Sequence, residues 1–350
     1  MDDFKFSYKT TLPKEANAPF IKITGDEINE YLVVFSIIKK DGIHKIKELK
    51  CNTNQTVYSN INQWYSNWLI EVYKDNQLII KDIFDVTNKV VFIKMDGHAL
   101  GDNIAWIPYV DVFRKQRNCT VICSTFFNDL FKDIYPEILF VQPNINIDNV
   151  YAQYYIGASK EWSAKYSPVC VDDVPLQFAA STLLNLPTDE VRPELEKQFK
   201  KINYSKKYVC ISEFASHKDK HWKYENGWQI IVDYLNSIGY DVVAISKEST
   251  NLKNVIDLTG DKSILERGQI LTNAEFFIGL SSGLSWLSWA VNTHVFLISD
   301  VTFINHEFQT NVTRISANPE IDSIRYDAKK ITTPDTVINS IKKYLETKNN

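Results

Sequence analysis

The sequence predicts an α/β protein: two successive parallel-sheet units that face a cleft, preceded by a β-rich domain. The first observation is that strand-like apolar runs alternate with helix-like segments from residue 86 onward, the order that parallel strands with crossover helices require. The second is that this alternation occurs twice, on either side of a charged, proline-containing stretch at 187–206. The third is that short β-rich runs separated by turn residues fill the chain before residue 86. We therefore expect domains at 1–85, 86–195 and 196–350.

Composition and charge exclude some classes of partner. Of the 350 residues, 44% are hydrophobic and 23% are charged, as in an ordinary globular protein. The formal net charge of −4 gives no field that attracts nucleic acid or an anionic membrane. The N-terminal run carries acids and lysines where a signal peptide needs an apolar core, and no run reaches the ~18 apolar residues of a membrane span. We expect a cytoplasmic protein that spans no membrane and binds no nucleic acid.

The first α/β unit is predicted from its apolar runs. Strands are expected at 89–95, 119–124, 138–142 and 148–157, and a second helix is expected over 126–138. The first helix is expected to begin near Asn103 or Ile104, because Trp106, Val110 and Phe113 repeat at i, i+4 and i+7. For the β-rich domain before this unit, a support or oligomerisation role is expected.

The second α/β unit repeats the same rhythm. Strands are expected within 208–216, 241–248, 254–260, 276–282 and 294–300, and helices within 225–239, 263–275 and 283–292. The chain closes on a packing helix with Thr333 as its N-cap and Pro334 at its first position. Val337, Ile341 and Leu345 repeat every four residues and predict its buried face.

The cysteines are expected to be buried thiols. They are Cys51, Cys119, Cys123, Cys170 and Cys210, and four of them lie in or beside apolar segments. Cys119 and Cys123 allow a metal site in principle, but they share a strand-like run with no second pair nearby. No other group has metal-ligand spacing, so we expect no metal and no cofactor.

An aspartate stands where the chain leaves the first strand of the first α/β unit. Gly97 and Gly101 allow a tight turn before Asp102, which is followed by the predicted helix. As an N-cap, Asp102 would have only a structural role. Because ligands of open parallel sheets bind beyond the carboxyl ends of strands, Asp102 can equally serve as a general base in the cleft.

Three strand ends of the second unit carry groups suited to a nucleoside diphosphate. Lys220 lies in a loop rich in histidine and lysine, and a lysine is a compact charge suited to phosphate. Ser282 and Gly283 form a strand-to-helix turn whose N–H groups favour an anion. Lys247 and Glu248 end another strand, where the carboxylate can bind ribose hydroxyls. A solvated basic loop, a serine N-cap and a surface ion pair are the three structural alternatives.

The common nucleotide motifs are missing. The chain contains neither G-x-G-x-x-G after a strand nor G-x-x-x-x-G-K-[ST], so nicotinamide chemistry and P-loop hydrolysis lose their main support. No D-x-D pair is present to hold a divalent ion against a diphosphate.

Taken together and in order, these segments resemble a known family. The segments are "GHALGDNIAWIP", "KDKHW" followed by "NGWQIIVDYL", "AISKE", "DLTGDKSI" and "AEFFIGLSSGLSWLSWAVN". They resemble the bacterial heptosyltransferases of the GT-B class, glycosyltransferase family 9, and most closely the branch that glycosylates autotransporter adhesins. The resemblance covers residues 86 to 315 and implies two Rossmann-like domains facing a cleft.

The resemblance implies an activity and roles for particular residues. It implies an inverting enzyme that moves heptose from ADP-heptose to an acceptor hydroxyl, a protein serine in the adhesin branch. Asp102 matches the catalytic aspartate. The donor-binding positions are Ser216, Lys220, Lys247, Glu248, Ser282, Gly283 and Leu284, and the supporting positions are His98, Gly101, Asp219 and Trp222. The branch also implies a protein acceptor and a homo-oligomer.

The chain departs from the family pattern at three places. Ser281 stands where the lipopolysaccharide branch usually has aspartate, and Trp286 where it often has histidine. After Asn318 the adhesin branch has an insert whose four cysteines bind iron, whereas this chain has no cysteine after Cys210. We therefore expect the family's iron site to be absent. The alternatives are a non-catalytic sugar-nucleotide-binding or scaffold relative, and a transferase that uses another NDP-hexose.

Overall fold

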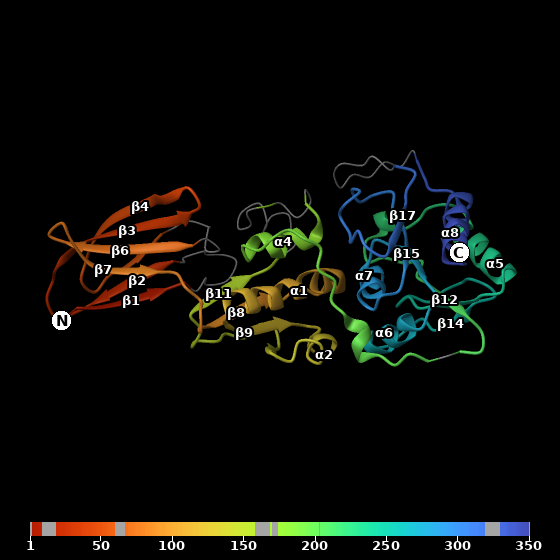
Figure 1. Cartoon of the computed structure of the whole chain (residues 1–350), viewed down its shortest axis with the longest axis horizontal. Coiled ribbons are helices and arrows are strands. Elements are labelled where there is room, and N and C mark those ends of the chain that lie inside the picture. Colours follow the sequence, from red (N-terminus) through yellow and green to blue (C-terminus); the bar gives the residue numbers. More distant parts are fainter. Residues whose placement is uncertain are drawn as a thin grey trace.

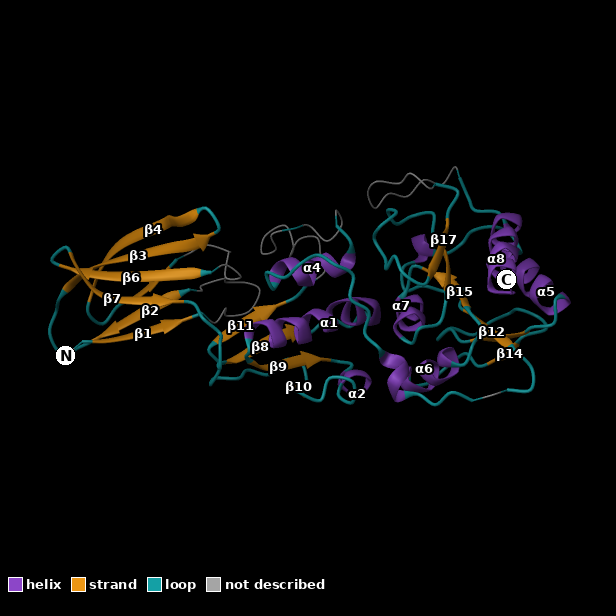
Figure 2. Ribbon diagram, in the orientation of Figure 1, coloured by secondary structure: helices purple, strands orange, loops and turns teal. Residues whose placement is uncertain are grey.

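The chain forms three units in a row, seen in the computed structural model in Figure 1. The structure describes residues 2–8, 19–59, 67–157, 169, 174–202, 204–318 and 330–349. A β unit lies at the N-terminal end, and two α/β units follow it (Figure 2). We call the α/β unit around strands β8 to β11 the first lobe and the one around strands β12 to β17 the second lobe.

The N-terminal unit consists of two antiparallel sheets. One has the order β1-β2-β5, with β1 (Asp3–Ser7), β2 (Phe20–Thr24) and β5 (Thr56–Tyr58). The other has the order β4-β3-β6-β7, with β3 (Glu30–Lys39), β4 (Gly42–Asn52), β6 (Trp68–Lys74) and β7 (Gln77–Ile83). Tyr8 joins this unit to the first lobe: its backbone pairs with Ala152, and its hydroxyl donates to Asp82 at 2.5 Å.

The first lobe has a fully parallel sheet of order β10-β9-β8-β11. Its strands are β8 (Val90–Met95), β9 (Thr120–Thr125), β10 (Ile138–Val141) and β11 (Ala152–Tyr155), and its helices are α1 (Leu100–Arg117), α2 (Asn128–Phe131) and α4 (Leu176–Leu183). The predicted apolar face of α1 is buried, with Trp106, Val110 and Phe113 at most 2% exposed. The Trp106 indole also donates to the Leu176 carbonyl at 2.9 Å, which fixes α4 over α1.

Two features of the first lobe differ from expectation. The helix expected over 126–138 is only the short α2, which ends at Phe131; Pro136 excludes a helix that continues to 138, because it disfavours the helical conformation at Tyr135. Helix α4 was not predicted from the sequence. Its short apolar run lies after a segment with no clear periodicity, and it is stabilised by packing against α1.

The second lobe has a fully parallel sheet of order β14-β13-β12-β15-β16-β17. Its strands are β12 (Tyr208–Ile211), β13 (Asp241–Ala244), β14 (Ile256–Asp257), β15 (Phe277–Leu280), β16 (Val295–Ile298) and β17 (Val312–Ile315). Its helices are α5 (Gly227–Ser237), α6 (Ile264–Thr272), α7 (Gly283–Ala290) and α8 (Pro334–Asn349). The doubled parallel sheet predicted from the sequence is confirmed.

The C-terminal helix α8 follows the prediction closely. It begins at Pro334, and the hydroxyl of Thr333 accepts a hydrogen bond from the Thr336 N–H at 3.3 Å, as an N-cap does. Val337 and Ile341 are buried against the second lobe, where α8 packs on α5. This helix closes one face of the second sheet.

The described cysteines are buried thiols, as predicted. Cys51, Cys119, Cys123 and Cys210 are free and buried, and burial raises the pKa of Cys119 to about 11. Cys170 lies outside the described residues. In the described parts of the chain, no helix has the length and apolar character needed to cross a membrane.

Candidate active site

A cavity of about 490 Å³ lies between the two lobes, at the carboxyl ends of their parallel strands. Most of the predicted site residues line it, namely His98, Gly101, Asp102, Ser216, Lys220, Lys247, Glu248, Ser282, Gly283 and Leu284. Asp219 and Trp222 do not; they line a separate small cavity of about 30 Å³ that also borders Lys220. The fold thus brings together residues that are more than 180 positions apart in the sequence, such as Asp102 and Leu284.

Asp102 lies inside the first turn of α1 and is not its N-cap. The helix begins at Leu100, with Ala99 as the N-cap residue. The N-cap interpretation fails because the helix starts earlier than expected: the buried amide of Asn103 donates to the carbonyls of Gly97 and Ala99, both at 2.9 Å, and so holds the preceding loop in place. The Asp102 carboxylate makes no cap bond and lines the cavity.

The environment of Asp102 suits a proton acceptor. Burial raises the pKa of this carboxyl to about 6, and the positive charge of Lys220 acts on it in the opposite direction. A carboxyl with a pKa of about 6 is mostly ionised at neutral pH, yet it binds a proton more readily than an exposed one. Asp102 and Lys220 come from different lobes, so this electrostatic interaction crosses the cleft.

Two glycines let the lobes approach each other beside Asp102. A Cβ at Gly101 would lie 2.7 Å from the Trp286 ring, and one at Gly283 would lie 2.9 Å from the Cβ of Leu100. The backbone of Gly101 is helical and not left-handed, so the tight-turn role expected for it is wrong. Glycine is needed here because α1 and α7 meet at their N-terminal turns.

The loop that carries Lys220 is anchored on both sides. The 3-10 turn η2 (Lys218–Lys220) precedes His221, whose ring Nε2 is 2.8 Å from the Ala215 carbonyl oxygen. The Trp222 indole donates to the Thr332 carbonyl at 2.7 Å, and its ring packs edge-on against Trp228 at 5.3 Å. Trp222 therefore anchors the Lys220 loop to Thr332 and Trp228, while Lys220 itself lines the cavity.

Ser282 is the N-cap residue of α7, but its side chain makes no cap hydrogen bond. Its hydroxyl oxygen is buried and has no hydrogen-bond partner among the described residues. The serine-cap interpretation therefore does not account for this side chain. Unpaired N–H groups at a helix start attract anions, and Ser282 adds an uncommitted hydroxyl to them.

A buried ion pair lies behind the Ser281–Ser282 turn. Glu307 is 4% exposed, and its carboxylate lies 3.0 Å from the Arg314 guanidinium. Opposing the effect of burial, His306, Arg314 and hydrogen bonding from Ser281 hold the pKa of Glu307 below its usual value. Arg314 also donates to the Phe303 carbonyl at 3.2 Å, so the pair fixes the loop that brings His306 to the cavity.

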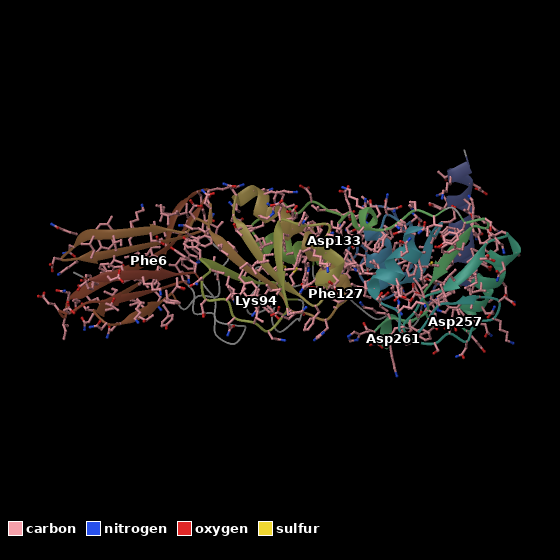
Figure 3. All side chains as sticks on the ribbon, turned by 90° about the horizontal axis from the view of Figure 1, so that it is seen from below. Phe6, Lys94, Phe127, Asp133, Asp257 and Asp261 are labelled. Atoms are coloured by element: carbon pink, nitrogen blue, oxygen red, sulfur yellow. The ribbon has the colours of Figure 1, made fainter. Side chains whose placement is uncertain are left out.

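Some cavity residues were missed by the sequence analysis. They are Leu176, Ser212, Asp261, Lys262, Arg267 and His306. Asp261, labelled in Figure 3, and Lys262 follow a strand end, so the same argument that selected Glu248 could have found them. Arg267 lies within a predicted helix and His306 in a long loop, and neither gives a sequence signal.

The rim of the cavity on the first lobe carries a stacked pair. The rings of His98 and Phe126 lie with centroids 3.8 Å apart and an interplanar angle of 21°. The two segments that carry them are joined through Asn103 of α1: its side chain accepts from the Thr125 hydroxyl at 2.7 Å and donates to the Gly97 carbonyl at 2.9 Å. His98 is thus held at the mouth of the cavity.

Comparison with known proteins gives the family. Residues 159–298 match the family model "Glycosyltransferase family 9 (heptosyltransferase)". The chain is 31% identical over 274 residues to the autotransporter heptosyltransferase Aah of Escherichia coli, covering 74% of this chain and 70% of Aah. It is 30% identical over 256 residues to the inactive autotransporter heptosyltransferase BimC of Burkholderia thailandensis, covering 69% and 60%.

The fold is shared with solved heptosyltransferases. The crystal structure of the dodecameric, iron-containing heptosyltransferase TibC of enterotoxigenic E. coli, in complex with ADP-D-β-D-heptose, superposes with a TM-score of 0.83 at 21% identity. The alignment covers 98% of this chain and 96% of TibC. The expected GT-B fold and the family resemblance are confirmed, and the chain belongs to glycosyltransferase family 9, the heptosyltransferases.

Proposed function

We propose that the chain transfers heptose from ADP-heptose to a serine hydroxyl of a bacterial surface protein of the autotransporter class, with inversion at the sugar carbon. The observation that carries this proposal is that Asp102 of the first lobe and Lys220 of the second line one cavity and interact electrostatically across it. The relatives support the donor and acceptor, because Aah acts as an autotransporter heptosyltransferase and TibC binds ADP-heptose.

In the proposed reaction Asp102 takes the proton of the acceptor hydroxyl. The hydroxyl oxygen forms a bond to C1 of the heptose on the face opposite the diphosphate. The bond between C1 and the diphosphate oxygen breaks, its electron pair leaves with ADP, and the anomeric centre inverts. The raised pKa of Asp102 suits this transfer, since a base works best when its pKa is near the working pH.

The second lobe binds the donor in this proposal. Lys220 and the N–H groups at Ser282 and Gly283 stabilise the departing diphosphate, a preorganised electrostatic role. Glu248 accepts hydrogen bonds from the ribose hydroxyls, with Lys247 beside it. The remaining predicted positions, Ser216, Leu284, His98 and Gly101, form the walls, whereas Asp219 and Trp222 support the Lys220 loop from outside the cavity.

The mechanism assigns no step to a metal. Iron is part of TibC, but within the described ranges no group of three or more His, Cys, Asp or Glu side chains is arranged so that it could hold a metal ion. The four described cysteines, Cys51, Cys119, Cys123 and Cys210, are part of no such group. The segment after Asn318, where the adhesin branch has its cysteine insert, lies outside the described residues as far as 329.

Assembly and location complete the proposal. TibC is dodecameric, and we expect this chain to form a homo-oligomer of undefined size, with the N-terminal β unit as a candidate for subunit contacts. The cytoplasmic location and the domain division at residues 85 and 195 stay predictions.

Nucleotide selectivity and product release test the proposed function. We expect ADP to raise the Tm more than UDP or GDP at the same concentration, because the proposed donor is ADP-heptose and the tighter ligand stabilises the folded state more. A nucleotide present at 100 times its Kd stabilises the folded state by about 2.7 kcal/mol.

We also expect ADP-heptose to release ADP when an autotransporter passenger segment is supplied. Since BimC is an inactive relative, a Tm shift without ADP release would instead identify a binding protein. A larger shift with UDP or GDP would identify another donor.

The pH dependence of kcat/KM follows from the raised pKa of Asp102. The base must be ionised to accept a proton, so activity is full above the pKa and is lost as the pH falls through it. We expect kcat/KM to fall about tenfold per unit below pH 6, the pKa of Asp102 being about 6. A rate profile measured with ADP release between about pH 4.5 and 8 tests this. A profile that stays flat down to about pH 4.5 would argue against Asp102 as the base.

A further inference from the structure

Arg267 is a buried arginine on the cavity wall. Helix α6 starts with a capping box between Ser263 and Glu266, which fixes the first turn, and Arg267 follows directly. Arg267 is 5% exposed and lines the cavity. Its position is therefore set by the helix start, and its side chain has little freedom.

The hydrogen-bond partners of its guanidinium are main-chain carbonyls. Nε donates to Ile245 at 3.0 Å, and Nη2 donates to Gly260 at 2.6 Å and to Ser246 at 3.4 Å. Nη1 donates to Lys262. No carboxylate of the described residues lies within ion-pair distance of Arg267, but the negative charges of Glu266, Asp261 and Glu248 act on it and oppose the effect of burial on its pKa. The hydrogen bonds of the guanidinium therefore all go to main-chain groups of the cavity wall.

The four carbonyls belong to two separate loops. Ile245 and Ser246 lead out of β13 to Lys247 and Glu248, whereas Gly260 and Lys262 belong to the loop between β14 and α6. The strand β14 has two residues, so the sheet alone gives this loop little support. The Gly260 N–H donates to the Ser246 carbonyl at 3.2 Å, and Arg267 bonds to both of these residues. Arg267 thus joins the two loops into one wall.

The two loops of this wall carry the lysines Lys247 and Lys262 as well as carboxylates, and the carboxylates suit a nucleoside. The exposed groups of the wall include the carboxylates of Glu248 and Asp261, which accept hydrogen bonds from hydroxyl and amino groups but repel phosphate. All three guanidinium nitrogens already donate to carbonyls, which leaves no pair of N–H groups for bidentate binding of a phosphate. The groups suited to a diphosphate, Lys220 and the start of α7, come from other strand ends.

We propose that Arg267 is the positioning residue for the nucleoside end of the donor: it fixes Glu248 and the 260–262 loop so that ribose and base meet a preformed surface. This inference rests on the proposed function and adds a residue that acts through other residues. Arg267 itself does not contact the donor. Because a preformed surface lowers the ordering cost of binding, its loss weakens binding of the nucleoside while the reacting end keeps its geometry.

Arg267→Lys tests the inference. A lysine has three donors at one point and cannot bridge carbonyls on two loops. We expect the Kd values of ADP and adenosine to rise about tenfold and the Kd of inorganic pyrophosphate to stay unchanged, measured by calorimetry. The donor KM rises in parallel, and kcat at saturating ADP-heptose stays within about threefold, since only binding common to the ground and transition states is lost.

A second variant reaches the same wall without touching the arginine. Gly260 has φ +90, where other residues are strained, and a Cβ there would meet no atom within 4 Å, so Gly260→Ala disturbs the loop by backbone strain alone. We expect the same selective loss of adenosine affinity. Arg192→Lys is the matched control: Arg192 also donates to a carbonyl, that of Ala290 at 3.0 Å, but it does not line the donor cavity, so nucleotide binding is unchanged.

The outcomes separate the inference from the proposed function. Equal loss of adenosine and pyrophosphate affinity in Arg267→Lys, or unchanged affinity for both in Arg267→Lys and Gly260→Ala, would overturn the positioning role while ADP transfer by the wild type still stands. A wild-type chain that binds no ADP would overturn the proposed function, and the inference with it. Circular dichroism and Tm show whether each variant is folded before its affinities are compared.

Discussion

Asp102→Asn should lower kcat by at least about 100-fold and leave the Kd of ADP nearly unchanged. The amide has almost the same shape as the carboxylate but cannot take the acceptor proton. The change is local, because Asp102 makes no cap hydrogen bond and the loop before it is held by Asn103. Single-turnover measurement of ADP release, together with calorimetry of ADP binding, separates the chemical step from binding.

Asp129→Asn is the matched control for this experiment. Asp129 also lies in the first turn of a helix of the first lobe, but it is exposed and paired with Lys132 at 2.6 Å. We expect the kcat of the Asp129→Asn variant to equal that of the wild type. If Asp102→Asn kept wild-type turnover, Asp102 would have only a structural role, and the proposed mechanism would lose its base.

Lys220→Ala should weaken ADP binding by about 10- to 100-fold, because a hydrogen bond to a charged group contributes about 1.5–3 kcal/mol. The same variant should change the acid limb of the kcat/KM profile. The charge of Lys220 lowers the pKa of Asp102, so its removal lets burial raise that pKa further. Activity should then be lost at a higher pH than in the wild type.

Lys218→Ala provides the control for Lys220. Both lysines belong to η2, but Lys218 is exposed and does not line the cavity between the lobes. Its loss should leave the Kd of ADP and the pH profile unchanged. Equal ADP affinity in Lys220→Ala and the wild type, measured at low salt, would remove Lys220 from the diphosphate site.

The arrangement of the strands was predictable because it depends on local patterns. Apolar runs separated by amphipathic helices specify parallel sheets, and parallel sheets place all their carboxyl ends at one edge. For that reason the sequence alone predicts that Asp102, Lys220, Glu248 and Ser282 lie near one another. Their placement around one cavity agrees with this expectation, whereas their roles stay proposals.

The sequence predictions that the structure corrects concern features that depend on contacts between distant segments. The start of α1 was misplaced because the residues that fix it are Asn103 and its partners in the preceding loop, and not a side-chain cap of the usual kind. Arg267 resembles any charged helix residue until its four carbonyl partners are known. The sequence predicts a turn at Gly101, but glycine is required there because the Trp286 ring of the second lobe leaves no room for a Cβ.

The meeting of Gly101 with Trp286 and of Gly283 with Leu100 also limits how the enzyme can be re-engineered. The separation between Asp102, the proposed proton acceptor, and the Ser282–Gly283 turn, the proposed phosphate site, depends on these two glycines having no side chain. In the proposed reaction, a bulkier sugar therefore cannot be accommodated by increasing the distance between the two lobes. Asp102 and the Ser282–Gly283 turn would then no longer reach the same substrate. Changes of substrate range have to come from the outer loops, with the glycine contact kept intact.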